Sequence, residues 1–510
     1  LAACGAGIRK DMLKSPSEAL PPAQDTPTAA YVEAKQAVHP PGQSGFRLLT
    51  LNTNALLSRV VLADHAEHSV DLQTYIFEND DTGRLVAEAL LRAADRGVRV
   101  RLLVDDITRK HDSARLLDAL DAHANIEVRV FNPFSTRLPG TLSKSAQMLL
   151  DFRRLNRRMH NKSFIVDNKF AVIGGRNIGN EYFDANADGN YRDLDLLAIG
   201  PVVEQASAAF DTYWNNEASL PASAWTDAKS SPADLVKVRA TLDRHVRAFA
   251  DSDYAKAALQ ELPDGPTADR QGQWFWGAAV MAADQPEKIA SDADQPELRI
   301  GPKVKQLMYG ASAELLVLSP YFIPSQPDRE ALVALAKRQV VVRIATNSLA
   351  ATDQPPVHSA YGPTRRQLLA GGVQLYELKP RAEVTQTDAQ DASIGVSLHA
   401  KSFVVDSRYV FVGSMNMDQR SSLLNTEQGI VVDSPALAQA VAQFFTSVTQ
   451  PANAWRLALE DKDGKGADGQ ILWTSEKDGK SETLDHEPEV GVMMRGEVLL
   501  LKLLPIDGLL

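Results

Sequence analysis

The chain is nearly free of cysteine: Cys4 is the single thiol in 510 residues. One thiol cannot form an internal disulfide, so packing and hydrogen bonds must hold the fold. Hydrophobic residues make up 44% and charged residues 23%, which is typical of a globular protein, and the length suits two or three domains.

Long apolar runs are also missing, and we therefore expect no membrane-spanning helix, which needs about 18 or more consecutive apolar residues. The most apolar segment, residues 498–510, is interrupted by Lys502, Pro505 and Asp507. Such a segment suits a position in a bilayer interface, and it equally suits a final helix packed on the core.

The chain also has no excess of positive charge. The formal net charge is −11, which argues against a protein that binds nucleic acid through its phosphate backbone. A local basic cluster, Arg153, Arg154, Arg157 and Arg158, still suits a smaller anion.

The first four residues, Leu1-Ala2-Ala3-Cys4, resemble a bacterial lipobox, in which the cysteine is acylated after a signal peptide is removed. This interpretation predicts a lipoprotein anchored through Cys4 in the cell envelope and associated with the membrane. An ordinary N-terminal cysteine is the alternative. The residues that follow, to about residue 45, are rich in Pro, Ala, Ser and Gln, and predict a tether or a loosely docked extension.

Strand and helix patterns occur in the same order twice. Alternating residues predict a strand at Val70–Phe77, followed by a helix at Arg84–Arg96 and a strand at Val98–Val104. About 245 residues later, Leu315–Ile323 and Arg338–Thr346 repeat the two strands. The chain is therefore predicted to be α/β, with two copies of one unit.

These patterns predict five regions: a tether (1–45), a first domain (46–216), a connector or insertion (217–298), a second domain (299–450), and a C-terminal hairpin region with an apolar, membrane-contacting tail (451–510). The acidic turn at 460–466 does not fit a calcium loop, because Lys465 and Leu472 stand where oxygen ligands are required. A hairpin between Trp455–Leu459 and Ile471–Trp473 is the expected structure.

Two motifs with identical spacing lie at corresponding places in the two halves. In each, lysine follows histidine by 2 positions, aspartate by 7, glycine by 14 and asparagine by 17. Two copies at the same offsets are unlikely to arise by chance. The residues are His160, Lys162, Asp167, Gly174 and Asn177 in the first copy, and His399, Lys401, Asp406, Gly413 and Asn416 in the second.

The spacing has a structural interpretation. Residues two apart in a strand project from one face, so each histidine and its lysine point together. A hairpin that turns at Asp167 or Asp406 then brings Asn177 or Asn416 back beside them. Small residues after the return strand, such as Gly175 and Ser414, are expected to leave room for a substrate phosphate.

Imidazole, ammonium and carboxamide groups on one surface suit a phosphodiester. With two halves facing each other, one histidine forms a phosphohistidine while the other protonates the leaving alkoxide, and the sequence does not decide which one attacks. A turn-forming role is preferred for Asp167 and Asp406. Asp193 in the first half and Glu427 in the second are the candidates for orienting the imidazoles. No His/Cys cluster has metal spacing, so no metal or cofactor is expected.

The paired motifs identify the chain as a member of the phospholipase D superfamily, a resemblance that runs from about Leu56 to the end. Residues 155–164, 174–179, 347–353 and 504–510 resemble bacterial cardiolipin synthases of the C type. The resemblance implies two pseudo-symmetric α/β domains with the active site between them. It also implies transfer between phospholipids, with phosphatidylglycerol or phosphatidylethanolamine as partners, to give cardiolipin.

Alternatives remain open at this point. Water could resolve the same phosphohistidine, giving a hydrolytic phospholipase D that releases phosphatidic acid, and the motifs do not separate the two reactions. A nuclease is disfavoured by the acidic chain, and a non-enzymatic scaffold by two intact motifs. His358 and Tyr361 resemble positions near the site in relatives and are candidate substrate-binding residues. Tyr75 and Tyr321 are expected to face the core.

Overall fold

The computed structural model describes residues 14–491 except for 108–110, 135–147, 149, 226–230, 253, 257–272, 292–294, 382–394, 461–468 and 478, together with residues 494 and 496. Cys4 and the apolar segment 498–510 lie outside the described residues, so the predictions made for them stay predictions.

The first half of the chain contains these helices and strands: α1 (Pro27–Gln36), β1 (Ser44–Leu49), α2 (Asn52–Asp64), β2 (Ser69–Thr74), α3 (Asp81–Asp95), β3 (Arg99–Asp105), α4 (His111–Leu120), β4 (Ile126–Phe131), α6 (Phe152–Leu155), β5 (Ser163–Val166), β6 (Phe170–Gly174), β7 (Gly189–Arg192), β8 (Asp195–Ile199), α7 (Pro201–Asn215), β9 (Ser219–Pro221) and α8 (Pro232–Ala250).

The second half contains β10 (Phe275–Ala283), α10 (Gly301–Tyr309), β11 (Glu314–Leu318), α11 (Gln326–Lys337), β12 (Val341–Asn347), α12 (Pro355–Tyr361), α13 (Arg365–Ala370), β13 (Gln374–Leu378), β14 (Gly395–Leu398), β15 (Ser402–Val405), β16 (Tyr409–Gly413), β17 (Gln428–Asp433), α14 (Pro435–Val448), β18 (Ala454–Glu460), β19 (Gln470–Lys477) and β20 (Lys480–Leu484).

Each half has a sheet with the same order of strands. The first runs β8-β6-β5-β2-β3-β4. The second runs β17-β16-β15-β11-β12-β13. In both sheets the last three strands are parallel, and the first strand of the motif hairpin, β5 or β15, pairs antiparallel with the nearest of them. This equivalence confirms the predicted α/β class with two copies of one unit.

The two sheets join through β1 and β10. Strand β1 pairs with β8 on one side and with the start of β10 on the other, and the rest of β10 pairs with β17. Residues 217–298, expected to be a connector, therefore contribute strands to the sheet as well as the helix α8. Strand β10 pairs along its length because β1 and β17 both leave an edge free for it.

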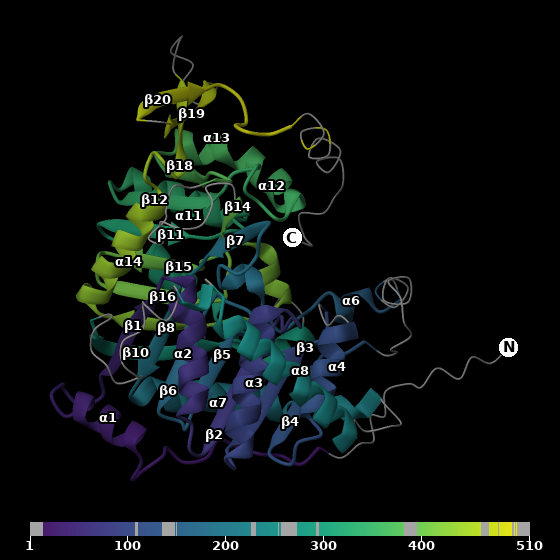
Figure 1. The fold of residues 1–510 in the computed structure, drawn as a ribbon. Coiled ribbons are helices and arrows are strands. Elements are labelled where there is room, and N and C mark those ends of the chain that lie inside the picture. Colours follow the sequence, from purple (N-terminus) through teal and green to yellow (C-terminus); the bar gives the residue numbers. More distant parts are fainter. Residues whose placement is uncertain are drawn as a thin grey trace.

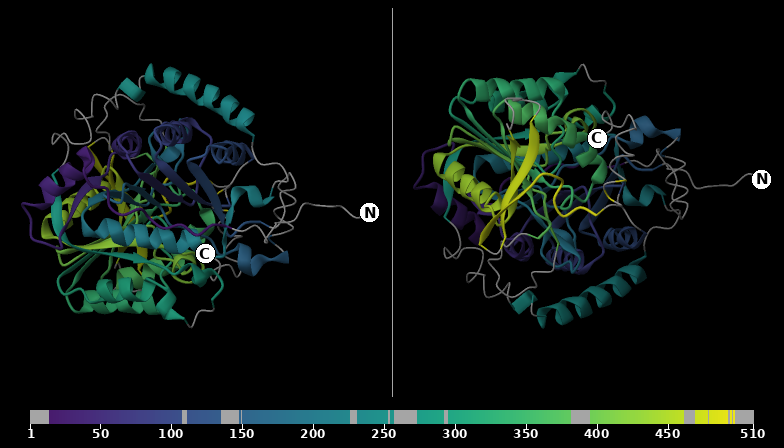
Figure 2. Two further views of the ribbon diagram at one scale, coloured as in Figure 1. Left: turned by 90° about the horizontal axis from the view of Figure 1, so that it is seen from below. Right: turned by 90° about the horizontal axis from the view of Figure 1, so that it is seen from above.

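Helices and sheets alternate in layers (Figure 1, Figure 2). One apolar cluster lies between the first sheet and α2, α3 and α4, and another between the second sheet and α10, α11 and α13. A central cluster contains α7 and α14 and side chains from both sheets. Because both faces of the sheets are covered, all six residues of β2 are buried.

Local signals explain where several helices start. The Asp80 side chain accepts the backbone N–H of Gly83 at the start of α3, and Ser325 forms a capping box with Asp328 at the start of α11. Pro363 lies in a 3-10 turn that separates α12 from α13. The predicted C-terminal hairpin is confirmed by the antiparallel pair β18 and β19.

The N-terminal segment packs on the first half from residue 14 onward. Buried Arg129 donates to the carbonyl of Ser15 at 2.7 Å, and buried Arg101 donates to the carbonyl of Ser17 at 2.9 Å. This part of the expected tether is therefore docked. Within the part of the chain that the structure describes, no helix has the length and apolar character needed to cross a membrane.

Candidate active site

The two histidine motifs meet where the halves of the molecule face each other. The backbone N–H of His160 donates to the carbonyl of Thr426 at 2.9 Å, and that of His399 donates to the carbonyl of Arg192 at 2.8 Å. The second contact continues a parallel pair of strands, β7 from the first half and β14 from the second (Figure 1). Each histidine is thus anchored on backbone of the opposite half.

Each imidazole also finds its carboxylate in the opposite half. The Nδ1 atom of His160 lies 2.9 and 3.2 Å from the carboxylate oxygens of Glu427. The Nδ1 atom of His399 lies 2.5 Å from Asp193 Oδ2. The sequence predicted both carboxylates, but it paired each with the histidine of its own half. In the structure each carboxylate pairs with the histidine of the other half. With Nδ1–H donating to a carboxylate, Nε2 of each ring is left for chemistry.

Burial and nearby lysines disfavour the protonated form of both imidazoles. Burial, together with the charges of Lys162 and Lys401, lowers the pKa of His160 well below its usual value. Burial and Lys401 lower the pKa of His399 to about 4, although Asp193 opposes this. Since each histidine responds to both lysines, the four side chains form a single site rather than two.

The carboxylates differ in charge. Burial raises the pKa of Glu427 to about 7. Burial acts in the same direction on Asp193, but the charge and hydrogen bond of His399, with Lys401 and Arg176, lower its pKa below the usual range. Asp193 is therefore ionised at neutral pH, while Glu427 titrates there.

The lysines are buried beside their own histidines. Lys162 Nζ donates to the carbonyl oxygen of His160 at 2.6 Å, and Lys401 makes the same contact with His399. Burial lowers the pKa of Lys162 and lowers that of Lys401 to about 8. Each histidine and its lysine therefore lie together, as their spacing predicts. They do so although the residues precede strands β5 and β15 and are not part of them.

The motif aspartates hold turns at the far ends of the two hairpins. Asp167 and Asp406 have positive φ angles of 53° and 52°, and so do the residues that follow them, which is the geometry of a type I′ turn. The Asp167 carboxylate accepts three backbone N–H groups, from Glu67 to Ser69. The Asp406 carboxylate accepts three more, from Ser312 to Glu314. Their contacts tie the hairpin to the strand beside it.

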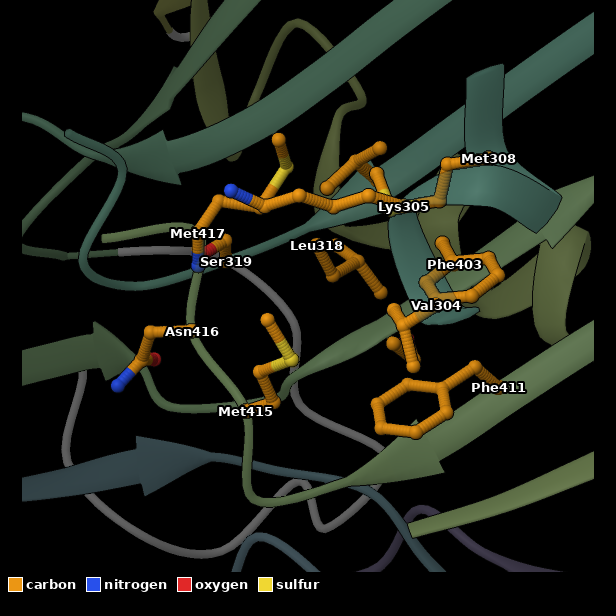
Figure 3. A pocket seen from close by; sticks show the side chains of 12 residues that line it. Val304, Lys305, Met308, Leu318, Ser319, Phe403, Phe411, Met415, Asn416 and Met417 are labelled. Atoms are coloured by element: carbon orange, nitrogen blue, oxygen red, sulfur yellow. The ribbon is translucent and has the colours of Figure 1, made fainter. Parts of the chain in front are cut away.

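The two asparagines of the motifs have different surroundings. Asn177 accepts from the backbone N–H of Ile76 and donates to the Tyr182 hydroxyl at 2.8 Å, whereas the buried Oδ1 atom of Asn416 has no hydrogen-bond partner among the described residues. Figure 3 shows Met415 and Met417 among apolar side chains while Asn416 points away from them. The cavity there is about 20 Å³, room for one water and not for an acyl chain.

Gly175 and Ser414 serve the carboxylates. A Cβ atom on Gly175 would lie 2.3 Å from Asp193 Oδ1, so the missing side chain makes room for Asp193 and not for a phosphate. Ser414 donates its hydroxyl to Glu427 and accepts the backbone N–H of Gln428 at 3.0 Å. Glycine in the first motif thus leaves space for Asp193, whereas serine in the second motif gives Glu427 a hydrogen bond.

His358 and Tyr361 lie in a buried cluster on α12. His358 Nε2 is 2.8 Å from Arg365 Nη2, and Arg365 pairs with Glu377 and Glu487 and lies over the Tyr361 ring. The side chains are 3% and 2% exposed. These contacts give both residues a structural role, and the proposal below does not use them.

Tyr75 and Tyr321, the matching tyrosines of the two halves, reach the site and are only half-buried, so the expectation that they face the core is wrong. The Tyr75 ring meets His160 edge-on at 5.1 Å and lies under Lys162 Nζ at 5.3 Å. Tyr321 instead donates to Asp353.

Several supporting residues did not emerge from the sequence. Asp105 accepts the backbone N–H of Met159 at 2.9 Å and pairs with buried Arg158 at 2.6 Å, which fixes the approach to His160. Arg176 donates to the carbonyl of Asp193 at 2.7 Å. The sequence gives little sign of these residues, because the partners of a buried ion pair or hydrogen bond can lie far apart along the chain. Arg158 is thus not available to an anion as its basic cluster suggested.

The His399 side of the site is aromatic. The rings of Tyr182 and Tyr191 lie 5.1 and 4.8 Å from the His399 ring, and 4.9 Å from each other. No group of three or more His, Cys, Asp or Glu side chains among the described residues is arranged to hold a metal ion.

Known proteins match most of the length of the chain. A family model described as "Cardiolipin synthase, PLD-like domain" matches residues 60–214 and 304–449. Cardiolipin synthase C of Escherichia coli is 39% identical over 92% of this chain and 97% of its own. An uncharacterized protein of Helicobacter pylori J99 is 32% identical, covering 92% of this chain and 90% of its own.

Among solved structures, phosphatidylserine synthase of Haemophilus influenzae Rd KW20 superposes with a TM-score of 0.56 and 13% identity, covering 91% of this chain and 95% of that one. At this identity the likeness shows the fold alone. The two family matches each contain one complete copy of the histidine motif, His160 to Asn177 and His399 to Asn416.

Proposed function

Because the chain belongs to the phospholipase D-like cardiolipin synthase family, we propose that it is a phosphatidyltransferase. It transfers a phosphatidyl group from one phospholipid to an alcohol of a second, and the product is cardiolipin or a related diphosphatidyl lipid. The observation that carries the proposal is the crossed pairing of His160 with Glu427 and of His399 with Asp193 in one site with two lysines.

The reaction proceeds in two steps. In the first, the neutral Nε2 of one histidine attacks phosphorus, and the bond from phosphorus to the head-group oxygen breaks. The other histidine enters the step protonated, with its charge balanced by its carboxylate and the substrate phosphate, and gives that oxygen a proton. In the second, the histidine that gave its proton removes one from the incoming alcohol, whose oxygen displaces the first histidine from phosphorus. The roles invert, and both imidazoles return to their starting state.

The remaining site groups act on charge and orientation. Lys162 and Lys401 stabilise negative charge on the phosphoryl oxygens, and Asn416 offers an amide at the same place. Asp193 and Glu427 hold Nδ1–H, so that Nε2 faces the substrate and the positive charge that forms on each ring is stabilised. Asp167, Asp406 and Asn177 hold the hairpins and loops on which these groups stand.

The substrates are phospholipids such as phosphatidylglycerol and phosphatidylethanolamine, and the protein therefore works at a membrane surface in the cell envelope. Acylation of Cys4 and contact of the apolar tail with the bilayer would both keep it there. Transfer is favoured over hydrolysis because Escherichia coli cardiolipin synthase C, which matches almost along its whole length, is named as a synthase.

The test uses purified full-length protein with vesicles of labelled phosphatidylglycerol, with and without phosphatidylethanolamine, and mass spectrometry of the lipids. We expect a diphosphatidyl lipid from the wild type and none from His160→Ala or His399→Ala. His486→Ala, which changes an exposed histidine, is the matched control and should remain active. Phosphatidic acid as the sole product would show hydrolysis and refute the synthase proposal.

A further inference from the structure

A buried ion pair lies behind Glu427, the carboxylate that holds His160. Lys288 Nζ donates to Asp284 Oδ2 at 2.7 Å, and the two side chains are 1% and 0% exposed. Asp284 Oδ2 also accepts the backbone N–H of Glu427 at 2.8 Å, and the backbone N–H of Asp284 donates to the Glu427 carbonyl at 2.9 Å. The ion pair is therefore fixed to the backbone of a residue that contacts a reacting histidine.

Lys288 is also bonded to the loop that follows the second motif. Its ammonium group donates to the Ser421 carbonyl at 2.8 Å, and the Ser421 hydroxyl accepts the backbone N–H of Asn416 at 3.2 Å. Asp284 comes directly after β10, and Lys288 lies in the 3-10 helix Pro286–Ile289 that follows. The chain between the two halves thus brings a buried cation to the back of the site.

Fold stability alone does not explain a charge in this position. Taking an ammonium and a carboxylate group out of water is costly, and apolar side chains of similar volume often stabilise a fold as well or better. The pair lies against the backbone of Glu427, whose own side chain is buried without a lysine or arginine bonded to it among the described residues. The charge of Lys288 is therefore best explained by its effect on this carboxylate.

The first half has a cation in the equivalent place, inside its motif. Arg176, which follows His160 by 16 positions, donates to the carbonyl of Asp193 at 2.7 Å. It also pairs with buried Asp195 at 3.2 Å. The charge of Arg176 favours the ionised form of Asp193. A buried cation, itself paired with a second carboxylate, thus stands behind the carboxylate that holds His399.

The second motif lacks this cation. Met415 follows His399 by the same 16 positions, and it lies among apolar side chains (Figure 3). Lys288, from outside the motif, stands behind Glu427 instead. The two halves therefore meet the same requirement with residues from different parts of the chain.

The charged and titratable side chains near Glu427 come from both halves and from the chain between them. They are the cations Lys162, Lys288 and Lys401, the acids Asp284 and Asp418, and His160, Tyr75 and Tyr213. Lys162 and Lys401 donate to the carbonyl groups of their own motif histidines and face the substrate phosphate in the proposed reaction. Lys288 differs from them, because it donates to Asp284 and Ser421.

The charge of Lys288 favours the ionised form of Glu427. Burial raises the pKa of Glu427 to about 7, and the charges of Lys162 and Lys288 oppose this rise. A bound phosphate takes up much of the charge of Lys162, whereas Lys288 stays beside Glu427 at every step. Asp284 does not cancel the charge of Lys288, because its carboxylate is also stabilised by the backbone N–H groups of Glu427 and, at 2.6 Å, of Ile300.

We infer that Lys288 is a positioning residue of the reaction: its buried ammonium group keeps Glu427 ionised and fixed in place behind His160. Its role in the second half corresponds to that of Arg176 in the first. This inference rests on the proposed function and deepens it, because it makes the chain between the two halves a part of the active site.

The test is the dependence of kcat/KM on pH for transfer by full-length protein, because the position of the acidic side of this profile does not depend on how much of a variant is folded. In Lys288→Met, ionised Glu427 loses a neighbouring positive charge, so the acidic side should move to higher pH by about one unit. Activity at about pH 6 should fall by about tenfold and should approach that of the wild type as the pH rises. Lys288→Arg keeps the charge, and its acidic side should stay at the wild-type pH.

Two further variants complete the design. Asp284→Asn combined with Lys288→Met leaves no buried carboxylate without its cation, and the acidic side should still lie above the wild-type pH. Lys237→Met is the matched control, since it removes a lysine from an ion pair with Asp234 on the surface of α8, where the lysine is 77% exposed. Its profile should be that of the wild type.

The outcomes separate this inference from the proposed function. An acidic side at the wild-type pH in Lys288→Met, with activity kept or lowered equally at every pH, would show that Lys288 only supports the fold, and would overturn the inference. The wild-type position in the double variant would overturn it too, because unpaired Asp284 would then be the cause of the shift. Wild-type protein that gives phosphatidic acid and no diphosphatidyl lipid would refute the proposed function. That hydrolysis would use the same His160 and Glu427, so its pH profiles would still test Lys288.

Discussion

His399 Nδ1 lies 2.5 Å from Asp193 Oδ2, although 206 residues separate them in the chain. The equivalent pair, His160 and Glu427, is separated by 267 residues. Each half therefore supplies the histidine of one pair and the carboxylate of the other. Neither half holds a complete pair of its own, and chemistry in the site depends on both being folded together.

Asp193→Asn should lower kcat by about 100-fold or more, because an amide does not hold Nδ1–H and stabilise the charged imidazole as a carboxylate does. Glu427→Gln should have an effect of the same kind on the other histidine. Steady-state kinetics of transfer measure both, and Glu330→Gln, on the exposed face of α11, is the control. Near-normal kcat in Asp193→Asn would contradict a role for the crossed pairs.

Asp406→Ala should act on stability more than on chemistry. The change removes the acceptor of three backbone N–H groups. Water can replace it at exposed Ser312 and Ala313, so the free energy of unfolding should fall by only about 1 kcal/mol. Thermal or urea unfolding measures this loss, while kcat per folded molecule should change by only a few-fold. A fall in kcat as deep as that of His399→Ala, in protein that remains folded, would show a direct catalytic role.

The dependence of kcat/KM on pH should be bell-shaped. Activity should rise as Glu427, whose pKa burial raises to about 7, becomes ionised and accepts Nδ1–H of His160. It should fall as Lys401, whose pKa burial lowers to about 8, loses its proton and its positive charge. Lys401→Arg keeps its charge at these pH values, so the alkaline fall should move far upward. A flat profile between pH 6 and 9 would contradict this assignment.

Ser414→Ala should move the acidic side of that profile to higher pH. The Ser414 hydroxyl donates to ionised Glu427 and favours that form, so its loss raises the pKa of Glu427 further. At neutral pH activity should fall several-fold and should recover as the pH rises towards 8. A loss that is independent of pH would point to a general structural effect of the serine.

Gly175→Ala should lower kcat by about tenfold or more, because a Cβ atom there would lie 2.3 Å from Asp193 Oδ1 and would displace this carboxylate from His399. Gly491→Ala, where the added carbon meets no atom within 4 Å, is the matched control. Kinetics and melting temperature measured together separate displacement of Asp193 from unfolding. Unchanged kcat would show that Asp193 tolerates movement.

Much of the site was predictable because its signals are local and repeated. The offsets from His160 to Asn177 and from His399 to Asn416 predict two equivalent hairpins, since strand periodicity and turn preference act over a few residues. The turns at Asp167 and Asp406 also follow from local chemistry. A strand such as β10 was harder to predict, because its pattern is weak and its pairing with β1 and β17 depends on residues far away.

The sequence by itself therefore determined the α/β halves, the two motifs and the identities of Asp193 and Glu427 as candidate partners. Only the tertiary structure decided that these partners are exchanged between halves and that Lys288 lies behind Glu427. The physical reason is distance along the chain: these contacts form between surfaces that meet only when the two sheets pack, and no pattern within a strand or helix encodes that meeting.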